Sequence, residues 1–361
     1  MPRVLLIKFG AIGDATMLLP AAHQLHLAGM DIDWVCGPTI LPILQLYPWI
    51  NPILADDRAI LLGSFAVRAA AIFKLWRMLA GRSYEIVATL YYDHRYAILA
   101  LPIRAPRKFM LSHSGRDRRI LPGRHHTDEF ARILLNLPDE LRPTHLPPLP
   151  PLLLPVSPLP PPTRTRVILA PAGARNMLAN ATLRRWPAEH YVELTQLLLQ
   201  GGCEVVLIGG PDDTDIRPLF ADLPVIDVIG KLPLPETIAL LDSADLFVTH
   251  DTGPLHLGGL TRASIVSIFG PTDPHVFAPR RPGTVALWGG EGFSCRPCYD
   301  THSFAPCPSN DCTWQISPAM VHAELLSLLA DRARGHLAPA RIVTPAISTP
   351  ASSFVKLEAH P

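Results

Sequence analysis

The sequence predicts an α/β protein with two Rossmann-like domains that face each other across a cleft. Its 361 residues exceed the usual size of one domain and suit two domains of about 150 residues each. Both halves begin with the same pattern, a short apolar strand, a glycine-containing turn and a helix. A proline-rich stretch between them predicts a boundary, so we expect domains at 1–145 and 164–333, a linker at 146–163 and a disordered tail at 334–361.

Composition limits the classes of function. The chain is 48% hydrophobic and 17% charged, as in a globular protein, and no apolar run has the length of a membrane-spanning helix. The first ten residues look like a strand and not like a signal peptide, so we expect a cytoplasmic protein. Residues 1–145 have 17 Lys and Arg against 12 Asp and Glu, a net charge of +5. This excess suits an anionic ligand or surface and is too sparse for nucleic acid.

The first strand, at residues 4–7, leads into the turn KFGAIGD at residues 8–14, which ends at Asp14. A helix follows to residue 27. In an open α/β sheet this turn lies at the carboxyl edge, where ligands bind. Asp14 therefore has two interpretations, a functional carboxylate or a cap of the helix that follows.

Residues 60–80 predict one long helix. Leu62, Phe65, Phe73 and other apolar residues share one face at helical spacing, whereas basic residues occupy the opposite face. An ordinary helix with its apolar face in the core is the simpler interpretation. A basic amphipathic helix resting on an anionic membrane surface is the alternative.

A basic segment follows at residues 104–124, where seven Lys and Arg oppose one acid. Such a segment is either solvated or a patch for carboxylates and phosphates, which Arg pairs in bidentate fashion. Arg116, Arg118 and Arg119 are the candidate acceptor-binding residues.

The most informative stretch is residues 246–274, LFVTHDTGPLHLGGLTRASIVSIFGPTDP. It predicts a strand, a turn, a short helix and a second strand. Such a turn leaves backbone N–H groups unpaired at the start of a helix, which suits a phosphate. Asp251, Thr252 and His256 place a carboxylate, a hydroxyl and an imidazole beside those groups.

These residues also carry a resemblance. The DTGxxH turn and the GPTDP loop resemble the nucleotide-sugar site of glycosyltransferase family 9, the ADP-heptose:lipopolysaccharide heptosyltransferases. Residues 8–14 and the segment 184–187, RRWP, extend the similarity over about 330 residues. The chain departs from the family at Arg184, where Lys is frequent, and in a longer preceding loop.

The resemblance implies the GT-B arrangement, with the donor in the C-terminal domain and the acceptor in the N-terminal domain. It implies an inverting transfer in which Asp14, beside Lys8, is the general base. It assigns donor binding to seven residues: Arg184, Asp251, Thr252, Gly253, His256, Lys231 and Leu232. The expected partners are a nucleotide sugar and a lipid-linked anionic glycan, with the protein at the cytoplasmic face of the inner membrane. No cofactor is expected for the chemistry.

The cysteines Cys295, Cys298, Cys307 and Cys312 have the spacing C-x2-C-x8-C-x4-C, which is compatible with a structural zinc site. Reduced free thiols and an oxidised pair are the alternatives. Two other functions also stay open: a sugar-nucleotide epimerase, which would need no acceptor, and a non-catalytic protein that binds nucleotide sugars.

Overall fold

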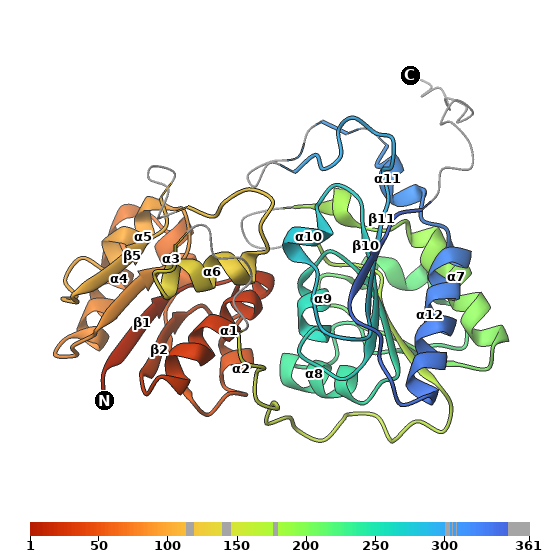
Figure 1. The fold of residues 1–361 in the computed structure, drawn as a ribbon, viewed down its shortest axis with the longest axis horizontal. Helices are drawn as coiled ribbons and strands as arrows, with labels where there is room; N and C mark the ends of the chain where they lie inside the picture. The colour runs from red at the N-terminus through yellow and green to blue at the C-terminus, as the bar shows by residue number, and fades with distance from the viewer. Residues whose placement is uncertain are drawn as a thin grey trace.

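The computed structural model describes residues 1–112, 119–138, 146–175, 180–299, 304, 306–307 and 309–345. These residues form two domains, each with a parallel β-sheet between layers of helices (Figure 1). The predicted fold class is confirmed.

The N-terminal sheet has the strand order β3-β2-β1-β4-β5, and every pair is parallel. Its strands are β1 (Arg3–Ile7), β2 (Asp31–Cys36), β3 (Ile50–Leu54), β4 (Ile86–Thr89) and β5 (Arg107–Met110). Its helices are α1 (Ile12–Leu27), α2 (Leu41–Leu44), α3 (Asp57–Leu62), α4 (Phe65–Leu79), α5 (His94–Leu99) and α6 (His126–Leu134). The strand order reverses between β1 and β4, and open α/β sheets bind ligands beyond such a point.

Burial explains the position of β1. Val4 to Ile7 are all fully buried, and successive side chains point to opposite faces of the sheet. Val4 and Leu6 pack in one core with residues of α1 and α6, whereas Leu5 and Ile7 pack in another with residues of α3, α4 and α5. Helices therefore cover both faces, as a continuous apolar strand requires.

The C-terminal sheet has the order β12-β11-β10-β9-β6-β7-β8 and is also parallel. Its strands are β6 (Arg166–Ala170), β7 (Glu204–Leu207), β8 (Ile226–Asp227), β9 (Leu246–His250), β10 (Ser264–Phe269), β11 (Thr284–Trp288) and β12 (Arg341–Val343). Its α-helices are α7 (Ala188–Gln200), α8 (Leu234–Asp242), α9 (Gly253–Gly258), α10 (Pro274–Phe277), α11 (Asp311–Trp314) and α12 (Pro318–Ala333). Two 3₁₀ helices are η2 (Thr182–Arg184) and η3 (Thr214–Phe220).

The structure differs from the sequence prediction at two segments. The predicted helix at 60–80 is broken into α3 and α4 at Gly63, which packs so closely on the Ala59 carbonyl that a Cβ would lie 2.4 Å from that oxygen. The predicted disordered tail is wrong for its first part, because β12 pairs with β11 and closes that edge of the sheet. The final residues, 346–361, lie outside the described part of the chain.

The two domains touch directly. Helix α1 packs against α9, and α2 packs against α8. Arg280 donates two hydrogen bonds to the Asp128 carboxylate, at 2.8 and 2.6 Å, and His125 Nε2 lies 3.0 Å from the Ala278 carbonyl. The linker touches both domains, since the Leu153 N–H donates to the Leu46 carbonyl and Ser157 bonds Ser243. These contacts hold the first turn of α1 against α9.

No helix among the described residues combines the length and the apolarity needed to cross a membrane.

Candidate active site between the two domains

Lys8 and Asp14 form an ion pair at the carboxyl edge of the N-terminal sheet. Lys8 directly follows β1 and is only 2% exposed, and Asp14 lies in the first turn of α1. The Lys8 Nζ donates to Asp14 Oδ2 at 2.6 Å and lies 4.6 Å from the centre of the Tyr91 ring. The N-cap of α1 is Ala11. Asp14 is thus held by Lys8, and the alternative in which it only caps the helix is not supported.

Several charges act on the Asp14 carboxyl group. Burial by itself raises its pKa, but attraction to Lys8, His126 and His256 and the Lys8 hydrogen bond outweigh burial and bring the pKa below its usual value. Asp14 is therefore ionised at neutral pH. An ionised carboxylate at a sheet edge can accept a proton from a bound hydroxyl group.

The C-terminal domain contributes the turn between β9 and α9. Asp251 is 1% exposed, and its Oδ2 accepts a hydrogen bond of 2.7 Å from Thr272 Oγ1. Thr272 belongs to the GPTDP loop, so the two halves of the sequence motif meet in space. Thr252 is the N-cap residue of α9 with extended backbone, and Gly253 is the first residue of that helix.

His256 connects this turn to the N-terminal domain. Its ring lies so close to Gly13 that a Cβ on Gly13 would be 2.7 Å from the ring, and Gly253 packs against Ile12. Burial, opposed by Asp251 and Asp14, lowers the pKa of His256, so its imidazole is neutral at pH 7. Two glycines therefore let α1 and α9 approach closely enough to bring the predicted acceptor and donor residues into one site.

Arg184, at the end of η2, points into the same site. Its Nη1 lies 3.4 Å from Asp251 Oδ2, and its guanidinium group lies over the rings of Tyr299 and Phe304, at 5.0 and 5.4 Å from their centres. Its Nε is buried and has no hydrogen-bond partner among the described atoms. A partly buried guanidinium with an unused donor is suited to bind an oxyanion.

Lys231 and Leu232 lie further along the sheet, after β8, which is the third strand from β9. The Lys231 Nζ is bound to Asp227, through the backbone carbonyl at 2.6 Å and the carboxylate at 3.5 Å. Leu232 packs at the edge of a hydrophobic core. Their contacts therefore do not join them to the cluster around Asp14 and Arg184, and their role in donor binding stays a prediction.

The sequence analysis missed Tyr299 and His126. Tyr299 packs on Arg184, whose guanidinium lies 5.0 Å from the ring centre, and burial raises the pKa of Tyr299. His126 begins α6, influences the pKa of Asp14, and makes an edge-on contact with Phe277 of the other domain. Neither belongs to a motif. His126 could have been singled out only by its place after the basic segment.

A third residue without a predicted role, Asp213, fixes the loop that precedes Arg184. Its two carboxylate oxygens accept hydrogen bonds from the N–H groups of Gly173 and Gly210, at 3.0 and 2.8 Å. Arg185 donates to the Gly173 carbonyl from the other side. Asp213 thus joins the turns that follow β6 and β7 and holds the base of the loop in place.

The remaining predicted site residues have mixed outcomes. Arg119 is exposed, and its carbonyl accepts a hydrogen bond of 2.6 Å from Arg132, whereas Arg116 and Arg118 lie outside the described residues. Cys295, Cys298, Cys307 and Cys312 form no disulfide. Among the described residues, no three side chains of His, Cys, Asp or Glu are placed to hold a metal ion, and a zinc site at these four cysteines stays a prediction.

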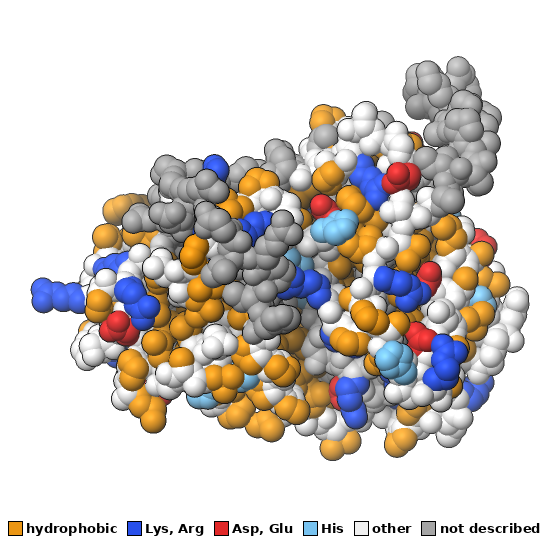
Figure 2. Space-filling model, in the orientation of Figure 1, with side chains coloured by type: hydrophobic (Ala, Val, Ile, Leu, Met, Phe, Trp, Pro, Cys, Tyr) orange, Lys and Arg blue, Asp and Glu red, His pale blue; other side chains and the backbone are white. Residues whose placement is uncertain are grey.

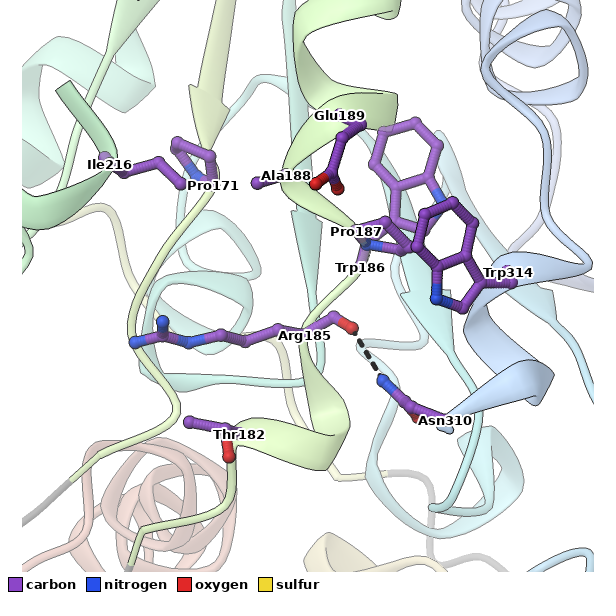
Figure 3. A pocket seen from close by; sticks show the side chains of 10 residues that line it. All are labelled: Pro171, Thr182, Arg185, Trp186, Pro187, Ala188, Glu189, Ile216, Asn310 and Trp314. Carbon is purple, nitrogen blue, oxygen red and sulfur yellow. Dashed lines mark hydrogen bonds between the residues drawn. The ribbon is translucent and has the colours of Figure 1, made fainter. Parts of the chain in front are cut away.

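A cavity of about 230 Å³ lies beside the Arg184 loop (Figure 3). Arg185 extends across it, and Asn310 donates to the Arg185 carbonyl at 3.1 Å. Trp186 and Trp314 lie at its other side. None of the predicted donor-binding residues lines this cavity, so it adjoins the site and is distinct from the cluster of charged residues.

The fold and the facing clusters define the GT-B class. Among solved structures, the chain is similar to a glycosyl transferase family 9 protein from Veillonella parvula, with a TM-score of 0.72 and 20% identity over 91% of this chain and 98% of that one. It is also similar to the ADP-heptose lps heptosyltransferase II of E. coli, with a TM-score of 0.66 and 19% identity over 92% and 99%. At these identities the similarity establishes the fold.

The sequence comparisons match one family over part of the chain. Residues 166–307 match the model for glycosyltransferase family 9 (heptosyltransferase). The chain is 29% identical over 119 residues to lipopolysaccharide heptosyltransferase 3 of Escherichia coli, which covers 31% of this chain and 35% of the relative. It is 29% identical over 130 residues to heptosyltransferase 1 of E. coli K12, covering 35% and 38%. These matches span about a third of each relative. Residues 166–307 are thus similar to glycosyltransferase family 9, and the whole chain has the fold of its solved members.

Proposed function

We propose that this protein is an inverting glycosyltransferase that transfers heptose from ADP-heptose to a hydroxyl group of a lipopolysaccharide-type glycan. The observation that carries the proposal is the Lys8–Asp14 pair of one domain facing the Arg184–Asp251 pair of the other, joined where His256 touches Gly13. The names of the relatives, which specify heptose and lipopolysaccharide, support the choice of sugar and acceptor.

In this reaction the acceptor hydroxyl lies beside Asp14. Its oxygen attacks the anomeric carbon of the donor while its proton passes to the Asp14 carboxylate. The bond between the anomeric carbon and the diphosphate oxygen breaks, and ADP departs with the electron pair. One displacement inverts the configuration at the anomeric carbon.

The site places positive charge and hydrogen-bond donors beside the diphosphate, which gains negative charge as it departs. Arg184 neutralises the diphosphate, and backbone N–H groups of the turn before α9 add hydrogen bonds. Lys8 keeps Asp14 ionised before the acceptor binds. The stack of Tyr299 and Phe304 on Arg184 restricts the guanidinium to one orientation. We propose that the chemistry runs on these groups, without a cofactor.

The decisive experiment combines purified protein, ADP-heptose and a lipopolysaccharide core fragment stripped of its acyl chains. We expect ADP release that requires the acceptor, together with a product heavier by one heptose in mass spectrometry. An epimer formed without acceptor would instead support the epimerase. Donor binding without any turnover would support the non-catalytic alternative. The ionised Asp14 beside Lys8 argues against that alternative, because mere binding of a nucleotide sugar does not need a general base.

We also propose the cytoplasmic face of the inner membrane as the place of the reaction, because a water-soluble nucleotide sugar and a lipid-anchored acceptor meet there. The protein would then act as a peripheral enzyme.

A further inference from the structure

The outer surface of α3, α4 and α5 is unusually apolar. Of the fifteen large hydrophobic side chains exposed among the described residues, seven belong to residues 62–101. They are Leu62, Phe65, Val67, Phe73, Met78, Ile98 and Leu101. We call this set the apolar face. An exposed patch of this kind marks an interaction surface.

Helix α4 explains how the patch arises. Its buried residues are Ile72, Leu75 and Leu79, so the core takes only one narrow stripe of the helix. Phe65 is 85% exposed and Phe73 59%, and alanines fill much of the remaining outer surface. The sequence prediction that placed Phe65 and Phe73 on the core face is therefore wrong, because the apolar residues of this helix cover more of its circumference than the buried stripe does.

The charged residues of α4 are all basic. Helix α4 contains no Asp or Glu, and its exposed cations are Lys74 and Arg77. Arg104 and Lys108 are exposed on the neighbouring segment after α5. Arg68, in contrast, is used internally, since it donates to the carbonyls of Ile60 and Gly63. Figure 2 shows hydrophobic side chains together with Lys and Arg side chains, and a smaller acidic spot, over the end of the molecule where α4 and β5 lie in Figure 1.

The apolar face is close to the active site. Arg95 donates to the Leu61 carbonyl at the end of α3 and is paired with Asp93, which follows the carboxyl end of β4. Tyr91, two residues earlier, lies under Lys8, the partner of Asp14. The turn from Leu62 to Phe65 thus adjoins the edge of the sheet at which the acceptor hydroxyl is expected.

We infer that the apolar face docks onto a bilayer that contains anionic lipids. Phe65 and Phe73 enter the interface between headgroups and acyl chains, while Lys74 and Arg77 pair with lipid phosphates. The exposed basic residues of α4 favour an anionic surface over a neutral one. That the acceptor is anchored in this bilayer rests on the proposed function. Binding of the protein to lipid does not rest on it, and lipid binding and sugar transfer are tested separately.

The test is co-sedimentation of the full chain with vesicles of phosphatidylcholine alone or mixed with phosphatidylglycerol. We expect binding only to the mixed vesicles, and weaker binding as salt is raised. Replacing both rings in Phe65→Ser/Phe73→Ser should weaken binding about tenfold or more. In Lys74→Gln/Arg77→Gln each lost charge should weaken it about fivefold.

The matched control is Val156→Ser/Leu326→Ser, which removes two side chains of similar exposure, 91% and 54%, from surfaces elsewhere on the chain. This control should bind vesicles as the natural protein does. Binding of Phe65→Ser/Phe73→Ser equal to the control would overturn the inference. The inference would also be overturned if the natural protein formed a concentration-dependent dimer, this variant did not, and neither protein bound vesicles. A second copy of the chain would then be the partner that covers the apolar face.

Activity with the acyl-free acceptor separates this inference from the proposed function. Phe65→Ser/Phe73→Ser should keep its ADP affinity and its transfer rate on that soluble fragment, because neither ring touches the active site. Loss of vesicle binding with transfer retained supports the docking surface. Vesicle binding by a protein that shows no transfer supports the surface and refutes the proposed activity. No vesicle binding by an active natural protein refutes the surface alone.

Discussion

Replacing Asp14 with Asn removes a charge and keeps the shape of the side chain. Removing a general base lowers a rate by about 100- to 10,000-fold, so we expect kcat for heptose transfer to fall by about a thousandfold. The affinity for ADP should not change, because Arg184, Asp251 and Thr252 belong to the other domain.

The same substitution should destabilise the protein. Lys8 is 2% exposed, and in Asp14→Asn it stays in the interior without its counter-charge. Leaving one charge of a buried pair alone costs about 3 to 5 kcal/mol, and the 29% exposure of the Asp14 side chain places the expected loss near 3 kcal/mol. This corresponds to a fall in Tm of about 6 to 12 °C.

A second substitution separates these effects. Lys8→Met/Asp14→Asn removes both charges, and we expect it to recover stability to within about 1 kcal/mol of the natural protein without regaining transfer. Asp242→Asn, which breaks the pair with Arg262 at the surface, is the control and should change stability by less than about 1 kcal/mol.

The measurements are single-turnover transfer and denaturation in urea at pH 7. Transfer by Asp14→Asn within about threefold of the natural rate would refute the assignment of the base. Equal stability of Asp14→Asn and the double variant would refute the argument about the buried Lys8.

Three further predictions concern the neighbouring residues. Arg184→Ala should raise the Kd for ADP about 10- to 100-fold in isothermal titration, because a charge-assisted hydrogen bond is lost; an unchanged Kd would exclude Arg184 from the donor site. Tyr299→Leu should raise the same Kd about two- to fivefold, whereas Tyr299→Phe keeps the ring under Arg184 and should not; equal effects of the two would argue against a ring contact. Burial lowers the pKa of His125 to about 4, so the fold holds it neutral; its contribution to stability is present above pH 6.5 and is lost as pH falls toward 4. The unfolding free energy should drop by about 2 kcal/mol per such His between pH 7 and 5, and His125→Gln should show a shallower drop in urea titrations; the same slope in both proteins would contradict this origin.

The predictable part of the site lies at strand ends. Lys8, Asp251 and Thr252 come directly after short apolar strands, Asp14 lies in the first turn of the helix that follows β1, and the carboxyl ends of parallel strands share one edge of a sheet. Local sequence therefore positions these residues. Their meeting across the domains depends on contacts such as that between Gly13 and His256, which no local pattern specifies.

Tyr299 and α4 were beyond such reasoning for different physical reasons. Tyr299 reaches Arg184 because its N–H and that of Cys298 donate to the Pro271 carbonyl, a contact between segments whose pairing is not encoded by any periodicity. Helix α4 is apolar on its inner and outer faces, so the pattern identified a helix and could not orient it.

The contacts of Asp251 give a reason for an Arg in the proposed donor site. A diphosphate that binds beside this buried carboxylate meets a like charge, which is costly in the interior. Thr272 donates to Asp251 Oδ2 at 2.7 Å, whereas Arg184 lies 3.4 Å from the same oxygen. The hydroxyl can therefore keep the carboxylate hydrogen-bonded while the guanidinium, whose Nε has no partner among the described atoms, offers its remaining donors to phosphate oxygens. Arg184 interacts only weakly with Asp251, so its positive charge can interact with the carboxylate and the diphosphate at the same time. It thereby offsets the repulsion between these two anions.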